Sequence, residues 1–90
     1  MAKKIVEKIL RYNAIFEPAE EGGFVVTVPK LPGLVTEGDT FEEAMAMARD
    51  AIVGYLQVLQ EQKEEIPGPD DGSITTLIDV TISKHKFAST

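Results

Sequence analysis

The sequence predicts a small α+β domain in which an antiparallel sheet carries one long helix on one face. Three observations support this fold class. One stretch, residues 40–59, has the periodicity of an amphipathic helix. Short segments with alternating or β-branched apolar residues lie before and after it, and turns rich in glycine and proline separate them. The expected element order is β-β-β-α-β, because a helix of about twenty residues spans roughly 30 Å and returns the chain to the far end of the sheet.

The start of the helix is marked by a capping box formed by Thr40 and Glu43. We expect the Thr40 hydroxyl to accept a hydrogen bond from an N–H of the first turn, and the Glu43 carboxylate to accept one from the Thr40 N–H. Glu42 and Glu43 also favour the positive end of the helix dipole. Eight apolar side chains share one helix face and are expected to form a core stripe: Phe41, Ala44, Met45, Ala48, Ile52, Tyr55, Leu56 and Leu59.

Four strands are expected around this helix, over residues 10–16, 24–28, 34–37 and 73–82. Pro18 and the glycines at 22 and 23 end the first strand, and two prolines, Pro29 and Pro32, end the second. Alternation then assigns the inward-facing residues as Leu10, Tyr12, Ala14, Phe16, Phe24, Val26, Val28, Ile78, Val80 and Ile82.

Ninety residues, of which 43% are hydrophobic and 27% charged, are enough for one folded domain with one modest core. We expect a basic N-terminal arm over residues 1–9, the domain over residues 10–83 and a polar tail over residues 84–90. The chain contains no cysteine, so no disulfide framework is expected. The apolar runs are too short to span a membrane and no leader is recognisable, which predicts a cytoplasmic protein with no membrane contact.

Charge is distributed unevenly along the chain. Residues 17–71 contain thirteen acidic side chains and three basic ones, whereas the segments before and after them are net positive, and the whole chain carries −6. An acidic body repels the phosphates of nucleic acids and attracts a basic partner.

No combination of residues points to catalysis or to a bound cofactor. His85, in the tail, is the only histidine. A metal site built from imidazole or thiolate ligands, or a nucleophile activated by histidine, would require more than this. The paired acids Glu20–Glu21 and Asp70–Asp71 lie in turns, where carboxylates are usually solvated. We therefore expect a protein that is not an enzyme, with no catalytic residue, metal or cofactor.

A second apolar line on one flank of the helix suggests self-association. Glycine inside a helix costs about 1 kcal/mol relative to alanine, so the close approach of another backbone would explain Gly54. A four-stranded sheet with one helix also leaves two edges and one face uncovered, which favours a homo-oligomer such as a dimer. Pairing edge to edge and pairing through the flank both remain open. The flank consists of Met47, Ala51, Gly54 and Val58.

Three ordered runs of residues resemble the HicB-type antitoxin domain of bacterial and archaeal toxin–antitoxin pairs. They are YNAIFEP at residues 12–18, EGGFVVTVP at residues 21–29 and LPGLVTEGDTFEEA at residues 31–44, and the resemblance extends over roughly residues 10–83. It implies a partial RNase H-like fold of order β-β-β-α-β. It also implies a partner, a small basic HicA-type toxin that is a ribonuclease acting through a histidine.

The chain departs from the family pattern in two respects. Many relatives carry a C-terminal DNA-binding domain, whereas only residues 84–90 follow the expected last strand, so direct DNA binding is not expected. The outer face of the first strand offers Asn13 and Ile15 where RNase H chemistry requires an aspartate, so nuclease activity is not carried over.

The leading hypothesis is a non-enzymatic antitoxin that binds the toxin and masks it. The alternatives are a degenerate RNase H-like, metal-dependent nuclease and a stand-alone dimeric scaffold with another protein partner. An acidic hairpin tip with a rigid apolar loop suits a basic protein better than RNA. The expected partner-binding residues are Glu20 and Glu21 at the tip, and Leu31, Pro32 and Leu34 after the second strand.

Overall fold

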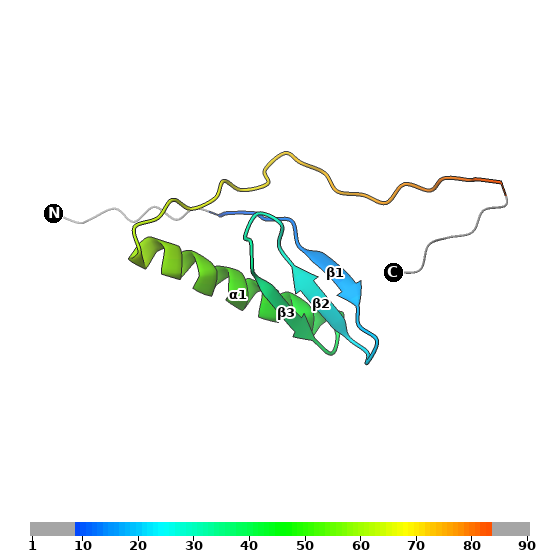
Figure 1. Cartoon of the computed structure of the whole chain (residues 1–90), viewed down its shortest axis with the longest axis horizontal. Helices are drawn as coiled ribbons and strands as arrows, with labels where there is room; N and C mark the ends of the chain where they lie inside the picture. Colours follow the sequence, from blue (N-terminus) through cyan, green and yellow to red (C-terminus); the bar gives the residue numbers. More distant parts are fainter. Residues whose placement is uncertain (1–8, 84–90) are drawn as a thin grey trace.

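The computed structural model describes residues 9–83, which form a three-stranded sheet followed by one long helix (Figure 1). The elements are β1 (Ile15–Pro18), β2 (Phe24–Thr27), β3 (Val35–Gly38) and α1 (Phe41–Glu61). The predicted α+β class and the order β-β-β-α are confirmed. Residues 1–8 of the predicted arm and the whole predicted tail, 84–90, lie outside the described residues.

The sheet is antiparallel in the order β1-β2-β3. Phe16 pairs with Val26, and Val26 pairs with Thr36, so these three residues lie in one row across the sheet. Successive residues of a strand point to opposite faces. The neighbouring rows, which therefore belong to the other face, are Ile15–Thr27–Val35 and Glu17–Val25–Glu37.

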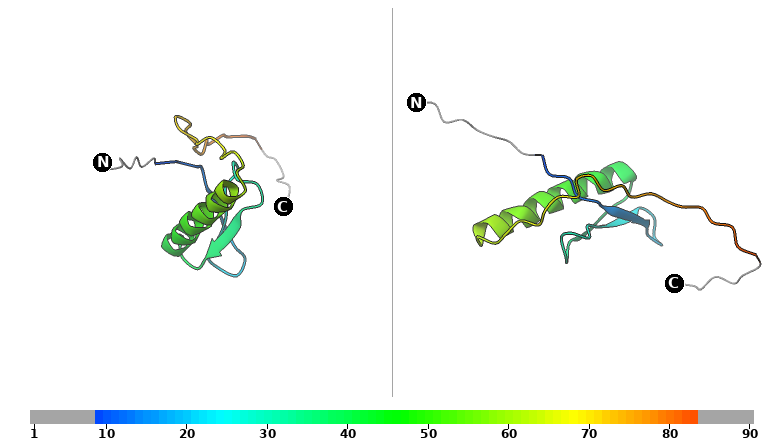
Figure 2. Two further views of the ribbon diagram at one scale, coloured as in Figure 1. Left: turned by 90° about the vertical axis from the view of Figure 1, so that its left-hand side faces the viewer. Right: turned by 90° about the horizontal axis from the view of Figure 1, so that it is seen from above.

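The helix covers one face of the sheet (Figure 2), and two of its alanines form the contact. Ala44 and Ala48 are 0% and 4% exposed and pack against Val26, which is fully buried. Their short side chains let the helix lie close to the strands. Three aromatic rings close this end of the core, with ring centroids 4.8 to 6.4 Å apart: Phe16, Phe24 and Phe41.

The loop between β2 and β3 closes the other end of the core. Val28, Leu31 and Leu34 are all buried there and pack against the second half of the helix. The Tyr55 hydroxyl donates a hydrogen bond of 2.9 Å to the Pro32 carbonyl, which holds the loop on the helix. The predicted inward residues Phe24, Val26 and Val28 of the second strand therefore all lie on the core side.

The predicted core stripe of the helix is buried only where another element covers it. Ala44 and Ala48 are buried, but Phe41 and Met45 are 46% and 41% exposed. The remaining stripe residues, Ile52, Tyr55, Leu56 and Leu59, are half-buried. The open side of the stripe faces β1 and the residues before it.

The predicted fourth strand is wrong for the described chain. Residues 73–82 are extended but pair with no strand, and in Figure 1 they run out past β1 and away from the body. Every residue from 71 to 83 is exposed. A β-branched composition shows that a segment suits a sheet, but it does not show which edge the segment can reach.

The paired part of the first strand also differs from the prediction. It spans Ile15–Pro18 rather than residues 10–16, and Pro18 is its last residue, opposite Phe24. The turn that follows is tight, because the Ala19 N–H donates to the Gly23 carbonyl over 3.0 Å. Residues 10–14 instead meet the chain that follows the helix, as shown below.

Two glycines hold the turn between β1 and β2 against the start of the helix. Gly23 has a φ of +77°, and a Cβ on it would overlap the carbonyl oxygen of Gly38. A Cβ on Gly38 would in turn overlap the backbone nitrogen of Ala44. The hairpin tip and the β3–α1 junction therefore lie at the same end of the molecule.

The predicted capping box is present with one change of donor. The Thr40 hydroxyl oxygen accepts from the Glu43 N–H over 3.1 Å. The Glu43 carboxylate accepts from the Asp39 N–H over 3.2 Å, not from the Thr40 N–H. Two free backbone donors at the helix start are satisfied in this way.

We expect Gly38→Ala to lower the free energy of unfolding by about 1–3 kcal/mol, because the added methyl group meets backbone that cannot move without shifting the helix. Gly54→Ala is the matched control. A Cβ at Gly54 meets open space, so this change should raise stability by about 1 kcal/mol in the isolated chain. Urea denaturation measures both, and equal effects at the two positions would contradict the close packing at Gly38.

Candidate protein-binding surfaces

The sheet face opposite α1 is uncovered and combines apolar and acidic side chains. Ile15 and Val35 are 45% and 64% exposed and flank Thr27 in one row. In the next row two exposed carboxylates flank the half-buried Val25. We define the outer face as Ile15, Glu17, Val25, Thr27, Val35 and Glu37. Protein interfaces combine apolar and charged side chains in this way.

An acidic end adjoins the outer face. Glu20 and Glu21, at the hairpin tip, are exposed and lie at the end of the sheet where the Gly23–Gly38 contact brings in the helix start. Residues 12–29 and 31–48 contain seven acidic side chains and no lysine or arginine. We define the acidic end as Glu20, Glu21, Asp39, Glu42 and Glu43, all of which are exposed.

The structure divides the five predicted partner-binding residues between two places. Glu20 and Glu21 precede β2, whereas the loop with Leu31, Pro32 and Leu34 follows its other end. Leu31 and Leu34 are only 0% and 7% exposed, so these side chains belong to the core and offer a partner little area. Pro32 is exposed.

Two consecutive turns explain why the leucines point inward. The Leu31 N–H donates to the Val28 carbonyl over 2.9 Å, and the Leu34 N–H donates to the Leu31 carbonyl over 3.1 Å. The loop thus folds back under the helix. The sequence contained the prolines that force the loop but no signal for this direction.

The predicted oligomer flank is partly open to solvent. Met47 and Val58 are 45% and 48% exposed, and Ala51 packs against the leucines of the loop. Nothing in the described chain comes close to Gly54. A contact of this flank with another chain therefore stays a prediction.

An apolar groove lies between β1 and α1. It has a volume of about 740 Å³. One wall is formed by β1 and the residues before it, with Tyr12, Ala14 and Phe16, and the other by the helix, with Met45 and Ile52. The groove occupies the side of the helix where the stripe residues remain exposed. Asp70 and Ser73 lie at its rim.

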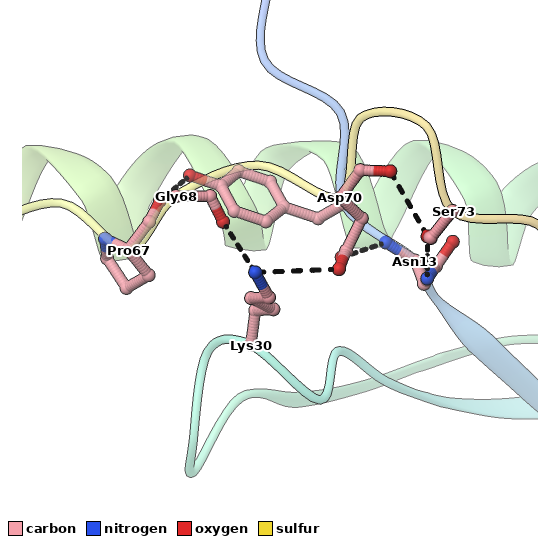
Figure 3. A network of polar contacts seen from close by, with 7 residues as sticks. Asn13, Lys30, Pro67, Gly68, Asp70 and Ser73 are labelled. Carbon is pink, nitrogen blue, oxygen red and sulfur yellow. Dashed lines mark hydrogen bonds and ion pairs between the residues drawn. The ribbon is translucent and has the colours of Figure 1, made fainter.

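A strap, residues 66–73, is fastened to the chain before β1 (Figure 3). The Asp70 N–H donates to the Arg11 carbonyl over 2.7 Å, and the Asp70 carboxylate accepts from the Asn13 N–H over 2.8 Å. The same carboxylate faces the Lys30 ammonium at 3.8 Å, and its side chain is only 12% exposed. Asp70 therefore joins three parts of the chain that are distant in sequence.

Tyr12 and Ser73 complete the attachment of the strap. The Tyr12 hydroxyl donates to the Pro67 carbonyl over 2.7 Å, and the Asn13 side-chain amide donates to the Ser73 hydroxyl oxygen over 3.2 Å. Burial raises the pKa of Tyr12 above 10.0, and the negative charge of Asp70 raises it further. The neutral phenol is therefore the form that the folded chain favours.

The described part of the chain shows no centre for metal chemistry. Within residues 9–83, no three His, Cys, Asp or Glu side chains are grouped so that they could hold a metal ion. His85 lies outside these residues. In the same range, no helix is both long enough and apolar enough to cross a membrane.

Comparison with known proteins identifies the chain's family. Residues 12–88 match the model of a family described as HicB_like antitoxin of bacterial toxin-antitoxin system. This chain belongs to the HicB-like antitoxin family. The resemblance inferred from the three sequence runs is thereby confirmed.

Several relatives support the assignment. The chain is 42% identical to Antitoxin HicB 1 of Photorhabdus laumondii over 66 residues, which cover 73% of this chain and 43% of that protein. It is 38% identical to Antitoxin HicB of Escherichia coli K12 over 67% of this chain and 44% of that protein. It thus spans less than half the length of these two antitoxins. A UPF0150 protein of Thermoplasma acidophilum is 38% identical, with 73% of this chain and 96% of that protein covered.

Membership of the HicB-like family supports an antitoxin role in a toxin–antitoxin system. The sequence prediction included only the hairpin-tip acids, and not the other carboxylates of the acidic end or those of the outer face. The available signal was the absence of lysine and arginine from residues 12–29 and 31–48.

Titration of Tyr12 tests the strap. In a Tyr55→Phe background we expect Tyr12 to ionise above pH 10.0 in the folded chain, and Asp70→Asn to reduce this shift without abolishing it, because burial remains. Since the folded pKa is raised, the stabilisation is complete below the unfolded pKa near 10 and is lost as pH rises through the folded value. Ultraviolet absorbance of tyrosinate measures the midpoint, with the denatured chain as reference. An unchanged titration midpoint in Asp70→Asn would contradict the placement of the Asp70 carboxylate near Tyr12.

Proposed function

We propose that this chain neutralises a small basic toxin of HicA type, an mRNA-cleaving ribonuclease of the cytoplasm, by binding it and covering its RNA-binding surface. The chain acts stoichiometrically and not as an enzyme. The single observation that carries the proposal is the acidic end beside the uncovered outer face in a member of an antitoxin family. The partner of an antitoxin is a protein, and this surface has the charge and the apolar area for a basic one.

The charge of the acidic end is complementary to the surface that an RNA-cleaving enzyme presents to its substrate. A ribonuclease that binds phosphates carries a cationic surface. Carboxylates of the acidic end attract such a surface and repel RNA, so the same charges favour the toxin and exclude its substrate. Exposed charges act mainly on the rate of association. Salt weakens this effect, because it screens the charges over about 10 Å at 0.1 M.

The apolar side chains of the outer face would supply the lifetime of the complex. Ile15 and Val35 are about half to two-thirds exposed, stand in one row and are held by the paired strands. Residues buried at the centre of an interface usually carry most of its binding energy, and charges at the rim contribute less. Pro32 lies at the end of the sheet away from the acidic end and is a secondary contact in this proposal.

We expect the double change Glu20→Lys and Glu21→Lys to slow association with the cognate toxin several-fold and to weaken the salt dependence of the rate, because it inverts the charge of the hairpin tip. Surface plasmon resonance at two salt concentrations measures both effects. The toxin for this test is the short basic protein that the proposed function expects to be encoded beside the gene of this chain.

Glu64→Lys with Glu65→Lys is the matched control. These two exposed carboxylates follow α1 at the opposite end of the molecule, so the net charge changes equally but the acidic end stays intact. The control should leave the rate of association with the toxin nearly unchanged. Equal slowing by the two double variants would show that only net charge matters, and it would remove the acidic end from the interface.

A further inference from the structure

The C-terminal segment, residues 74–82, pairs with no strand among the described residues 9–83. Four of its aliphatic side chains are among the most exposed large hydrophobic side chains of the described residues: Ile74 is 90% exposed, Leu77 96%, Ile78 81% and Val80 78%. Seven of its nine residues are β-branched, a composition that suits a β-strand, and Asp79 is its only charged residue. An exposed, extended segment of this composition readily pairs with another chain.

The described part of the chain is correspondingly extended. Its radius of gyration is 17.6 Å, whereas a compact chain of this length has about 12 Å. The strap fixes the segment's start, because Asp70 binds Arg11 and Asn13. Beyond Asn13 only five residues of the β1 edge remain before the turn, about 17 Å, whereas residues 74–82 extend over about 30 Å. The segment's own sheet edge is thus too short for it.

The segment is complementary to a second copy of itself. In an antiparallel pair centred on Ile78, each Ile78 lies opposite the other, Thr76 lies opposite Val80, and Ile74 lies opposite Ile82. These residues share one face of the paired strands because they alternate along the chain. On the other face Thr75 lies opposite Thr81, and Leu77 lies opposite Asp79, so the two aspartates do not face each other directly.

We propose that two copies of this chain form a twofold dimer through antiparallel pairing of their C-terminal segments about Ile78, and that the apolar face of this ribbon packs into the grooves between β1 and α1. A two-stranded ribbon alone is only marginally stable in water. Each copy offers an apolar groove of about 740 Å³ whose rim includes Ser73, directly before the segment. The twofold arrangement uses the same surfaces of both copies and closes the assembly.

Cysteine cross-linking tests the register of this pair, because the chain has no cysteine of its own. In the proposed dimer Ile78→Cys places the two new thiols directly opposite each other, within reach of a disulfide. We expect air oxidation of this variant to give a covalent dimer in high yield. Ile74→Cys and Ile82→Cys are the controls. Each should fail to link to itself, because the two copies of either residue lie about 27 Å apart, and a mixture of the two should link.

Sedimentation equilibrium at micromolar concentration tests the dimer itself. The wild-type chain should have about twice its monomer mass of 9.8 kDa. Ile78→Asp should reduce the mass to that of the monomer, because it places two carboxylates opposite each other. Thr81→Asp, on the other face, should leave it unchanged, and circular dichroism should show the helix intact in both.

Several results would overturn the proposal. A wild-type chain of 9.8 kDa, or a dimer that persists in Ile78→Asp, would show that the segments do not hold two copies together. Failure of Ile78→Cys to link, or equally efficient linking of Ile74→Cys with itself, would exclude the register. A dimer lost on Met47→Lys but kept in Ile78→Asp would place the contact on the helix flank instead.

Discussion

The close contact of Ala44 and Ala48 with Val26 is the constraint on which the rest of this structure depends. The short side chains of Ala44 and Ala48 let α1 lie close to Val26 of the sheet, and all three residues are at most 4% exposed. Larger side chains at the helix positions would lift the helix from the strands and open the core. With the spacing fixed at the centre, aromatic rings close one end of the core and the β2–β3 loop closes the other.

This constraint also determines what remains on the surface. One helix can cover only one face of a three-stranded sheet, so the outer face stays open, with Ile15 and Val35 exposed on its two edge strands. The glycine contact that anchors the helix start gathers five carboxylates at one end. The features that build the core therefore also leave an acidic, partly apolar surface of the kind that the proposed function requires.

Local signals were enough to predict the body of the fold. The capping residue Thr40, the apolar period of the helix and the alternation of Phe24, Val26 and Val28 each report interactions within a few residues along the chain. The same signals failed at the proline loop and at residues 73–82. There the outcome depends on contacts between distant segments, such as Tyr55 with Pro32 and Asp70 with Arg11.

The candidate surface was predictable only in part, for the same reason. Glu20 and Glu21 could be assigned because a hairpin tip is always exposed. The contribution of Asp39 and Glu42 could not, because it depends on the close approach of Gly23 to Gly38, and glycines in turns rarely reveal what they touch. Leu31 looked like exposed rigid area in the sequence and proved to be fully buried.

The proposed function requires that the toxin binds the sheet face away from the helix. Methyl-labelled NMR spectra of the chain, recorded with and without the cognate toxin, test it most directly. We expect shifts of the Ile15, Val25 and Val35 methyl signals. The signals of Val53 and Val58, which are about half exposed on the helix, should change little. Shifts confined to the two helix valines would contradict it.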